Sequence, residues 1–406
     1  MNKVKPYYFF LFFILLFIAF CVIVPDSGYD KYFWISWSKG IAERGLGSIY
    51  SNPEVNNFPL VLYLLKVFTL FFSANSIDVF SINYLKCFVI IFDFATLAVV
   101  VSLFKKNNIN LLLCLVFVFN PAFWYNTVIW GQVDSVHTFS VFVSLLFAIN
   151  KKPLPALIFM LLAVNTKFQA VVFLPVLLMI VFNTERTEKP QSYTESILSV
   201  IILAGIQLII FLPFIVSSNF SQTIHSLINS SVDFYPNVSR NAYNLWYLFF
   251  ADPLNTSDQI TFLLPLKLWG ILLFVLFYAL ILFIFLKSKK GLSEIFLVFT
   301  LISLGFFYFN TQMHERYVHP VVLFAGLYAI FSKRYYIFII ASFAYLLNLE
   351  AVMQMLSYFD DEVFGFIIHY KTWFIFNPVF ISLLFLSAIV IGIIDLRRNE
   401  STVNRP

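Results

Sequence analysis

Long apolar runs separated by short polar connections extend over almost the whole chain. A helix needs about 20 apolar residues to cross the hydrocarbon core of a bilayer. We therefore predict a membrane-spanning helix in each of the long runs, which cover residues 7–25, 83–104, 195–216, 261–286, 293–309, 317–332, 335–350 and 374–395.

Polar residues interrupt two further pairs of apolar runs. The interrupted runs cover residues 109–126, 133–150, 153–165 and 169–182. Trp130-Gly131-Gln132-Val133-Asp134 separates the first pair, and Asn165-Thr166-Lys167 separates the second. These runs are short for a crossing, which indicates tilted or broken helices. The whole pattern predicts an all-α, polytopic transmembrane helical bundle with about 12 crossings, within a range of about 10–13.

A different pattern follows the first run, where residues 26–73 are only partly apolar. Trp34, Trp37 and Ile41 recur at helical spacing, which predicts a helix lying in the membrane interface with its indoles at headgroup depth. Residues 58–72 are too short for a full span and carry a lysine, so a re-entrant or interfacial helix is expected there. We interpret 26–73 as an extracytoplasmic connection built from interfacial helices.

Composition narrows the class of protein. Hydrophobic residues make up 61% of the 406 residues and charged residues 12%, whereas soluble domains hold about 45–50% and about 25%. The chain is therefore predicted to be an integral, multi-pass membrane protein, with the lipid bilayer as a partner. The net charge of +5 is modest and forms no basic patch, so nucleic acid is not an expected partner.

No residue pattern indicates a cofactor. Cys21, Cys87 and Cys114 lie inside apolar runs, which favours buried thiols over a disulfide or metal framework. The spacing of His314 and His319 matches no metal-ligand set. We therefore expect neither a metal site nor another cofactor.

The basic residues predict how the chain is oriented. Most of the 26 Lys and Arg residues occupy every second connection and the two ends of the chain. Cytoplasmic connections are enriched in Lys and Arg, so both termini are expected in the cytoplasm, at a bacterial inner membrane. The first run lacks a small-residue cleavage site and is expected to remain as a span. We expect one transmembrane domain over 1–395, with an extracytoplasmic loop at 217–260 and a cytoplasmic tail at 396–406.

The same orientation places the polar clusters of the chain on one side of the membrane. These clusters cover residues 26–58, 130–134, 165–169, 217–260 and 310–316. Ionisable groups at membrane depth usually face a bundle interior or an aqueous cavity, and they mark function. Because all five clusters are predicted to be extracytoplasmic, we expect one active cavity on that face.

Three carboxylates in these clusters are candidate general bases. Asp26 and Asp30 follow the first span, and Asp134 closes the polar motif. A carboxylate partly shielded from water can take a proton from a sugar hydroxyl. Capping of a helix amino end explains Asp30 and Asp134 as well, because acids are favoured there. Beside Asp134, Gln132 and Trp130 are candidates for holding substrate, and Trp130 is also typical of an interfacial belt.

Two basic residues are candidate phosphate ligands. Lys167 stands between two short apolar runs next to Gln169, another substrate-binding candidate, and Arg316 belongs to His314-Glu315-Arg316 at the predicted outer mouth of a helix pair. Arg can bind a phosphate through two parallel hydrogen bonds, and Glu315 could orient its guanidinium. Snorkelling of Lys167 and a self-contained ion pair between Glu315 and Arg316 are the competing interpretations.

Other polar residues carry weaker signals. Asn241, Asn244 and Trp246 lie in a predicted extracytoplasmic loop, and their residue types are common both in sugar contacts and in interfacial loops. Lys86 and Asp93 share roughly one face of a predicted span two turns apart. We interpret Asp93 as an interhelical polar contact in preference to a catalytic group.

Taken together, these residues resemble the GT-C superfamily of integral-membrane glycosyltransferases, and within it the bacterial group related to the GPI mannosyltransferase that adds the second mannose. The resemblance covers roughly residues 7–330. It departs from the family pattern at Phe58-Pro59-Leu60, where Tyr-Pro-Pro is common, and at Lys167-Phe168, where Lys-Pro is common. It rests on Asp30 with Trp37, Asn120-Pro121, Trp130-Gly131-Gln132-Val133-Asp134, Thr166-Lys167-Phe168-Gln169, Asn241-Ala242-Tyr243-Asn244-Leu245-Trp246 and His314-Glu315-Arg316-Tyr317.

The resemblance implies that a sugar, mannose or another hexose, passes from a polyprenyl-phosphate donor to a glycan, lipid or protein acceptor on the extracytoplasmic face. It also implies that Asp30 is the base of an inverting transfer. Lys167 and Arg316 are then expected to stabilise the leaving phosphate, with Gln132 and Asn244 among the residues that hold sugar hydroxyls.

Two alternatives stay open. A transporter or flippase of lipid-linked sugars also explains polar groups near broken helices, although transporters usually carry inverted repeats and this chain shows no internal repeat. A polymerase or ligase of surface glycans would keep the chemistry and use a longer lipid-linked donor.

Overall fold

The computed structural model describes residues 30–182, 193–217, 220–231, 235–250, 259–261, 263–288, 290–359 and 369–401. The predicted span 7–25 and Asp26 lie outside the described residues. The sequence predicted one domain over 1–395, and the chain groups into two compact units. The first unit contains residues 1–106 and 127–234, and the second contains residues 107–126 and 235–406.

Six helices among the described residues are long and apolar enough to cross a membrane. They cover Ser81–Lys106, Glu195–Ser217, Leu266–Leu286, Leu292–Phe309, Tyr336–Met353 and Pro378–Arg398. A bent pair, Leu111–Val118 with Pro121–Val128, is a seventh candidate whose halves meet at 52°. The bend falls at Asn120-Pro121, because proline cannot continue a preceding helix. The all-α helical architecture predicted from the sequence is confirmed.

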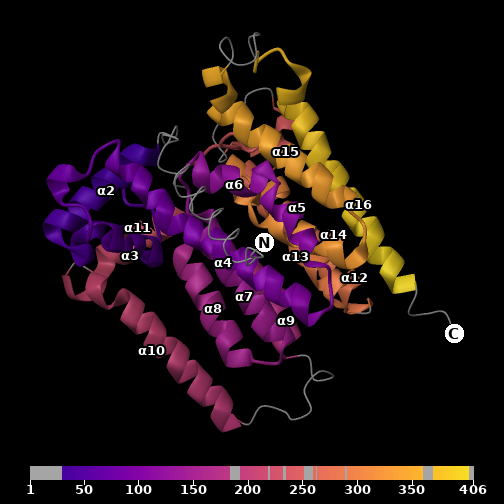
Figure 1. Ribbon diagram of the computed structural model, residues 1–406, viewed down its shortest axis with the longest axis horizontal. Coiled ribbons are helices and arrows are strands. Elements are labelled where there is room, and N and C mark those ends of the chain that lie inside the picture. The colour runs from indigo at the N-terminus through magenta and orange to yellow at the C-terminus, as the bar shows by residue number, and fades with distance from the viewer. Residues whose placement is uncertain are drawn as a thin grey trace, which may run out of the picture. The chain divides into compact units, whose positions relative to one another are not determined.

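The first unit is built from eight helices among its described residues, drawn from indigo to rose in Figure 1. They are α2 (Asp30–Arg44), α3 (Pro59–Phe68), α4 (Leu85–Lys106), α7 (Asp134–Ile149), α8 (Pro153–Thr166), α9 (Leu174–Val181), α10 (Tyr193–Ser217) and α11 (Phe220–Ser231), joined in places by the 3-10 helices η1 (Leu46–Ser51), η2 (Ala74–Ser76), η3 (Ser81–Tyr84) and η5 (Phe168–Phe173).

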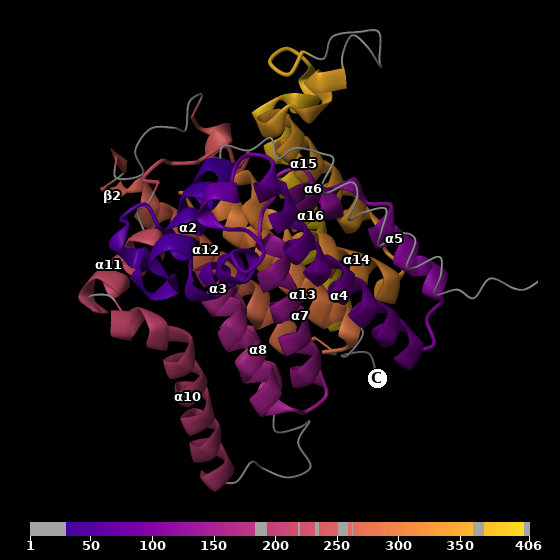
Figure 2. The same cartoon turned by 60° about the vertical axis from the view of Figure 1, so that its left-hand side comes forward.

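The helices α7 and α8 form an antiparallel hairpin in this unit (Figures 1 and 2). Only Asn150, Lys151 and Lys152 connect them, and Pro153 begins α8, a position where the missing N–H of proline costs nothing. The Ser144 hydroxyl donates to the carbonyl of Ala156 at 2.7 Å across the pair. A short connection therefore places the start of α7 beside the end of α8.

The amphipathic helix predicted after the first run is present as α2, but its tryptophans lie inside the protein. Trp34 and Trp37 are 3% and 2% exposed, and they belong to one apolar core with Ile41, Leu62 and Val89. The indoles therefore face protein and not lipid headgroups, contrary to the expectation. The reason is that α3 and η1 pack against α2 and cover its apolar face.

Helix α10 is the least covered span of the first unit. Only 11% of its apolar window is buried, and both views show its amino end standing away from α8 (Figures 1 and 2). One of its polar attachments is a reciprocal amide pair: Asn165 Nδ2 donates to Gln207 Oε1 at 2.7 Å, and Gln207 Nε2 donates to Asn165 Oδ1 at 3.2 Å. Such a pair satisfies two amides that lipid cannot hydrogen-bond.

The second unit contains α5 (Leu115–Val118), most of α6 (Pro121–Val128), α12 (Leu266–Leu286), α13 (Leu292–Phe309), α14 (Pro320–Ser332), α15 (Tyr336–Met353) and α16 (Pro378–Ser401), with the 3-10 helices η4 (Leu111–Cys114), η7 (Leu245–Leu248), η8 (Glu315–Val318), η9 (Met355–Phe359) and η11 (Phe374–Phe376). Two short strands, β1 (Ile260–Thr261) and β2 (Leu264–Pro265), pair antiparallel with Ile260 opposite Pro265. Helices α13 and α14 form the core, since nearly every residue of both is buried.

Three predicted boundaries differ from the structure in this unit. The run 261–286 starts with the β1–β2 pair, so α12 begins at Leu266. The run 317–332 divides into η8 and the short α14, because Pro320 starts a new helix. The predicted tail 396–406 begins inside α16, which continues to Ser401 with Arg398 in its last turn, where a cation suits the helix dipole.

Candidate functional site

Asp30 and Gln132 come together in the first unit. Asp30 is half-buried at the first residue of α2, where the positive end of the helix dipole favours a carboxylate. Nε2 of Gln132 donates a hydrogen bond to Oδ2 of Asp30 at 2.7 Å. The fold therefore joins the acid of the first loop to the polar motif 102 positions later.

Gly131 provides the turn that makes this contact possible. Its φ of 74° lies in the left-handed region, which glycine enters without a steric penalty. The turn separates the end of α6 from the start of α7. Trp130 and Gln132 on either side are 6% and 4% exposed, so the Trp130 indole packs within the protein and not in an interfacial belt.

Asp134 and Lys167 form an ion pair at the open end of the α7–α8 hairpin. Nζ of Lys167 contacts Oδ1 of Asp134, and their side chains are 17% and 1% exposed. Asp134 is the first residue of α7, and Lys167 follows the last residue of α8. Each charge therefore lies at the helix end that its sign favours. The snorkelling interpretation of Lys167 is wrong, because its ammonium turns to a buried carboxylate.

This pairing separates the two predicted bases. Asp134 is fully buried, and its Oδ1 is already in contact with the ammonium of Lys167. Asp30 is only half-buried and accepts from a neutral amide. The role of either carboxylate as the base stays a prediction. Gln169, the neighbour of Lys167 in the sequence motif, is half-buried in η5.

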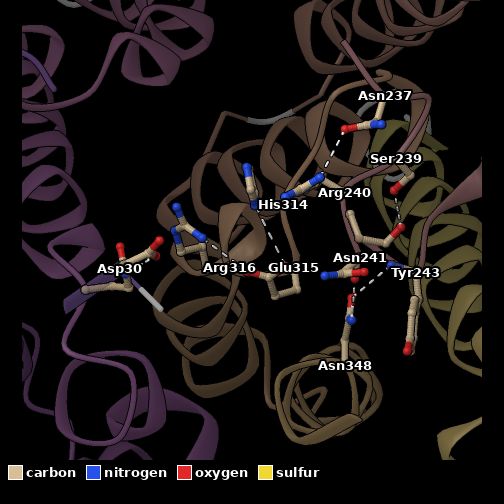
Figure 3. A network of polar contacts seen from close by, with 12 residues as sticks. Asp30, Asn237, Ser239, Arg240, Asn241, Tyr243, His314, Glu315, Arg316 and Asn348 are labelled. Atoms are coloured by element: carbon tan, nitrogen blue, oxygen red, sulfur yellow. Dashed lines mark hydrogen bonds and ion pairs between the residues drawn. The ribbon is translucent and has the colours of Figure 1, made fainter. Parts of the chain in front are cut away.

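In the second unit, two loops pair through their backbones. The N–H of Arg240 donates to the Met313 carbonyl at 2.9 Å, and the N–H of Gln312 donates to the Val238 carbonyl at 3.1 Å. Asn241 and Gln312 have φ of 63° and 61°, the left-handed conformation that asparagine tolerates better than most residues. The pairing brings His314-Glu315-Arg316 beside the loop that carries Asn241 and Asn244 (Figure 3).

Glu315 is the buried centre of this charged cluster. Its side chain is 1% exposed, and Nη1 of Arg316 contacts Oε1 of Glu315 at 3.2 Å. Nδ1 of His314 lies 3.9 Å from Oε2. The predicted ion pair between Glu315 and Arg316 is confirmed. The Arg316 side chain is 14% exposed, and its phosphate-binding role stays a prediction.

The side chains of Asn244 and Trp246 donate hydrogen bonds to backbone carbonyls. Nδ2 of Asn244 donates to the carbonyls of Phe307 and Asn310 at 3.0 and 3.1 Å. Nε1 of Trp246 donates to the carbonyls of Phe309 and Asn310 at 3.1 and 3.2 Å. Both side chains therefore cap the carboxyl end of α13 and anchor the loop. Their contact with sugar hydroxyls stays a prediction. To make it, Nδ2 of Asn244 and Nε1 of Trp246 would have to break these hydrogen bonds to the backbone.

Asn348 is a residue of this network that sequence reasoning missed. It lies in α15, donates through Nδ2 to the Asn241 carbonyl at 2.8 Å, and accepts through Oδ1 from the Tyr243 N–H at 3.0 Å (Figure 3). Burial, and secondarily the Glu315 carboxylate, raises the pKa of the Tyr243 phenol to about 12. An amide inside the apolar run 335–350 was the available signal, because such groups are costly in a membrane.

Arg240 is the second missed residue. Its guanidinium lies 4.9 Å from the centroid of the Tyr235 ring, and its Nη1 donates to Asn237 Oδ1 at 3.4 Å. The Tyr235 ring in turn meets the His314 ring edge-on, with centroids 5.0 Å apart. The available signal was a basic residue on the side of the membrane predicted to hold few of them.

The described residues include no group of three or more His, Cys, Asp or Glu side chains placed to hold a metal ion. Comparison with known proteins gives no family model that matches the chain and no curated protein that matches it.

Proposed function

We propose that this chain is a membrane glycosyltransferase of the GT-C type. It transfers mannose or another hexose from a polyprenyl-phosphate donor to an acceptor hydroxyl on the extracytoplasmic face. The hydrogen bond between Gln132 and Asp30 carries this proposal, because it sets a carboxylate that can act as a base beside an amide that can hold a sugar hydroxyl. A substrate hydroxyl that replaces Gln132 on Oδ2 would stand in the position of a proton donor.

The proposed reaction is a single inverting displacement. Asp30 takes the proton of the acceptor hydroxyl while the acceptor oxygen forms a bond to the anomeric carbon of the donor. The bond from that carbon to the phosphate oxygen breaks on the opposite face, and its electron pair leaves with the polyprenyl phosphate. The leaving group is a stable phosphate monoester, so the reaction needs no separate general acid. Catalysis then consists of positioning and of stabilising the phosphate charge.

Lys167 in the first unit and Arg316 in the second are each proposed as candidates for stabilising that phosphate, as the resemblance implies. Each is already compensated by a buried carboxylate, Asp134 and Glu315 respectively. Both carboxylates are 1% exposed and contact the cations directly, so they hold them in place. Binding of a phosphate requires each cation to share its donors between the carboxylate and the phosphate, which Arg can do with its five N–H groups.

The remaining parts of the proposal concern the membrane. We propose about 12 crossings, in which the short helices α7, α8 and α14 supplement the long spans, with both termini in the cytoplasm of a bacterial cell. The pairing of α7 with α8 supports this, since each helix of the pair satisfies its own backbone internally.

The test uses purified protein in vesicles with radiolabelled polyprenyl-phosphate mannose and a candidate acceptor. Loss of a general base lowers turnover by about 10²–10⁴-fold. The Asp30→Asn variant should therefore release polyprenyl phosphate more slowly than the unchanged protein by that factor. The control is Glu43→Gln, an exposed acid on the same helix, which should leave turnover unchanged. Wild-type turnover in Asp30→Asn would move the base to another residue. Translocation of the donor lipid without release of polyprenyl phosphate would contradict the proposed enzyme and would support a flippase.

A further inference from the structure

Arg240 carries a positive charge that no acidic residue among the described residues compensates. It is the only Lys or Arg in the sequence of the predicted loop 217–260, and it is half-buried. The contacts of its guanidinium are with neutral groups, the ring of Tyr235 at 4.9 Å and Oδ1 of Asn237 at 3.4 Å. A guanidinium has five N–H donors, and within the described part of the chain only Nη1 has an acceptor. Arg240 therefore has charge and donors available for an anion.

Backbone pairing fixes Arg240 beside His314. The two residues face each other in an isolated bridge, and the N–H of Arg240 donates to the Met313 carbonyl at 2.9 Å. On the other side, Asn348 of α15 holds the carbonyl of Asn241 at 2.8 Å. Because the backbone is held on both sides, less conformational freedom is lost when the side chain binds a ligand.

Aromatic rings connect Arg240 to Arg316. The Tyr235 ring lies under the Arg240 guanidinium and meets the His314 ring, with the ring centroids 5.0 Å apart. The His314 ring meets the Tyr317 ring at 5.2 Å, and the Arg316 guanidinium lies 5.7 Å from the Tyr317 centroid. Each guanidinium is therefore one ring away from His314, and Figure 3 shows His314 between the two arginines.

The two arginines differ in how their charges are compensated. Glu315 contacts Arg316 at 3.2 Å and is 1% exposed, so it holds that guanidinium in place. Arg240 has no such contact. Guanidinium groups match phosphate oxygens through two parallel N–H bonds, and a second guanidinium near the first allows one phosphate to be bound by both.

We propose that Arg240 and Arg316 hold one phosphate group beside the His314 ring. The phosphate belongs either to a polyprenyl phosphate or to the head group of a bilayer phospholipid. The assignment to the leaving group of the donor rests on the proposed function. The binding of a phosphate by the two arginines does not.

The first experiment measures binding of radiolabelled polyprenyl phosphate, without a sugar, to the purified protein in phosphatidylcholine nanodiscs. Loss of charged hydrogen bonds in Arg240→Gln should raise Kd by about tenfold. The control is Lys371→Gln, which removes an exposed cation from the same unit and should leave Kd unchanged. Arg240→Lys keeps the charge and loses the fork, so it should raise Kd by about threefold, and it decides the matter if Arg240→Gln does not fold.

The competing interpretation is that Arg240 only anchors its loop on the Tyr235 ring. Arg240→Gln would then lower the temperature of unfolding and leave Kd at the value of the unchanged protein. We expect the reverse, a raised Kd with an unfolding temperature equal to that of Lys371→Gln. Unchanged Kd in the folded Arg240 variants would overturn the proposal.

A second background tests whether the two arginines hold the same group. Arg316→Lys keeps a cation beside Glu315 but cannot bind a phosphate through a fork. In this background Arg240→Gln should raise Kd by clearly less than tenfold, because residues that act on one group are not additive. The same tenfold loss in both backgrounds would show that the arginines bind separately, which contradicts a shared site.

The source of the phosphate is distinguished by repeating the binding measurement with labelled phosphatidylglycerol. Arg240-dependent binding of polyprenyl phosphate alone assigns the site to the lipid of the donor, and then Arg240→Gln should raise KM for the donor about tenfold. Arg240-dependent binding of phosphatidylglycerol assigns it to a phospholipid. Dependence of neither probe on Arg240 would overturn the site. If no transferase activity is found, the proposed function fails, while these binding measurements still decide the phosphate site.

Discussion

At the residue scale, the candidate site depends on the backbone conformation at one residue and on one ion pair between side chains. Gly131 is one, because the direction of Gln132 toward Asp30 follows from a left-handed turn at that position. The Asp134–Lys167 pair is another, because each charge matches the dipole of its own helix and the charge of its partner. Asp134 is therefore held by Lys167, and the role of Asp30 as the base stays a proposal.

Replacement of Gly131 tests the first of these choices. Gly131→Ala should lower the free energy of unfolding by about 1–2 kcal/mol, because a Cβ at positive φ clashes with the backbone. Gly205→Ala is the matched comparison. Gly205 lies inside α10 with no atom near the position of a Cβ, so alanine there should stabilise by about 0.5–1 kcal/mol. Unfolding in detergent measures both, and a stabilised Gly131→Ala would contradict the turn.

At the element scale, close helix contacts set the position of the second charged cluster. Gly270 of α12 lies against the end of α13, where a Cβ would come within 2.9 Å of the Thr311 nitrogen and 3.0 Å of the Phe309 carbonyl oxygen. The chain continues from there to His314-Glu315-Arg316. The approach of α12 therefore determines where the loop leaves α13.

The element-scale prediction concerns Gly270→Ala. Its near neighbours are backbone atoms, so they cannot move aside, and we expect a loss of about 1–3 kcal/mol from overpacking. Gly305 offers a contrast, since a Cβ there would meet the Phe277 ring at 2.2 Å. Phe277→Leu should rescue Gly305→Ala, whereas trimming a side chain should not rescue Gly270→Ala. Equal rescue at both positions, seen by thermal unfolding, would argue against the backbone contact.

At the scale of the whole molecule, orientation in the membrane decides whether the polar clusters share one side. Helix α4 with η3 gives a direct test, because the exposed Ser76 of η2 precedes it and the exposed Asn107 directly follows it. We expect Ser76 outside and Asn107 in the cytoplasm, since Lys105 and Lys106 end this helix.

Single cysteines at these positions, in a chain whose own three cysteines are replaced, measure this orientation. Ser76→Cys in intact cells should react with a membrane-impermeant maleimide. Asn107→Cys should react only with a permeant maleimide or after lysis. The reverse pattern would place the candidate site on the cytoplasmic face and would remove the basis for an extracytoplasmic donor.

The sequence by itself determined the helical class and the positions of most of the long apolar helices. Apolar runs of about 20 residues have few other solutions in a bilayer, because every backbone group must be satisfied internally. The Asp134–Lys167 contact was also within reach of the sequence, since the two residues lie equally far from the short connection of an antiparallel hairpin.

Only the tertiary structure decided which polar residues meet. Gln132 contacts Asp30, Asn348 holds the loop at 241–243, and the tryptophans of α2 turn inward. Each outcome depends on which helix packs next to which, and hydrophobic periodicity is the same for a face covered by lipid and a face covered by protein. That is why the sequence indicated where polar groups occur and not which of them are partners.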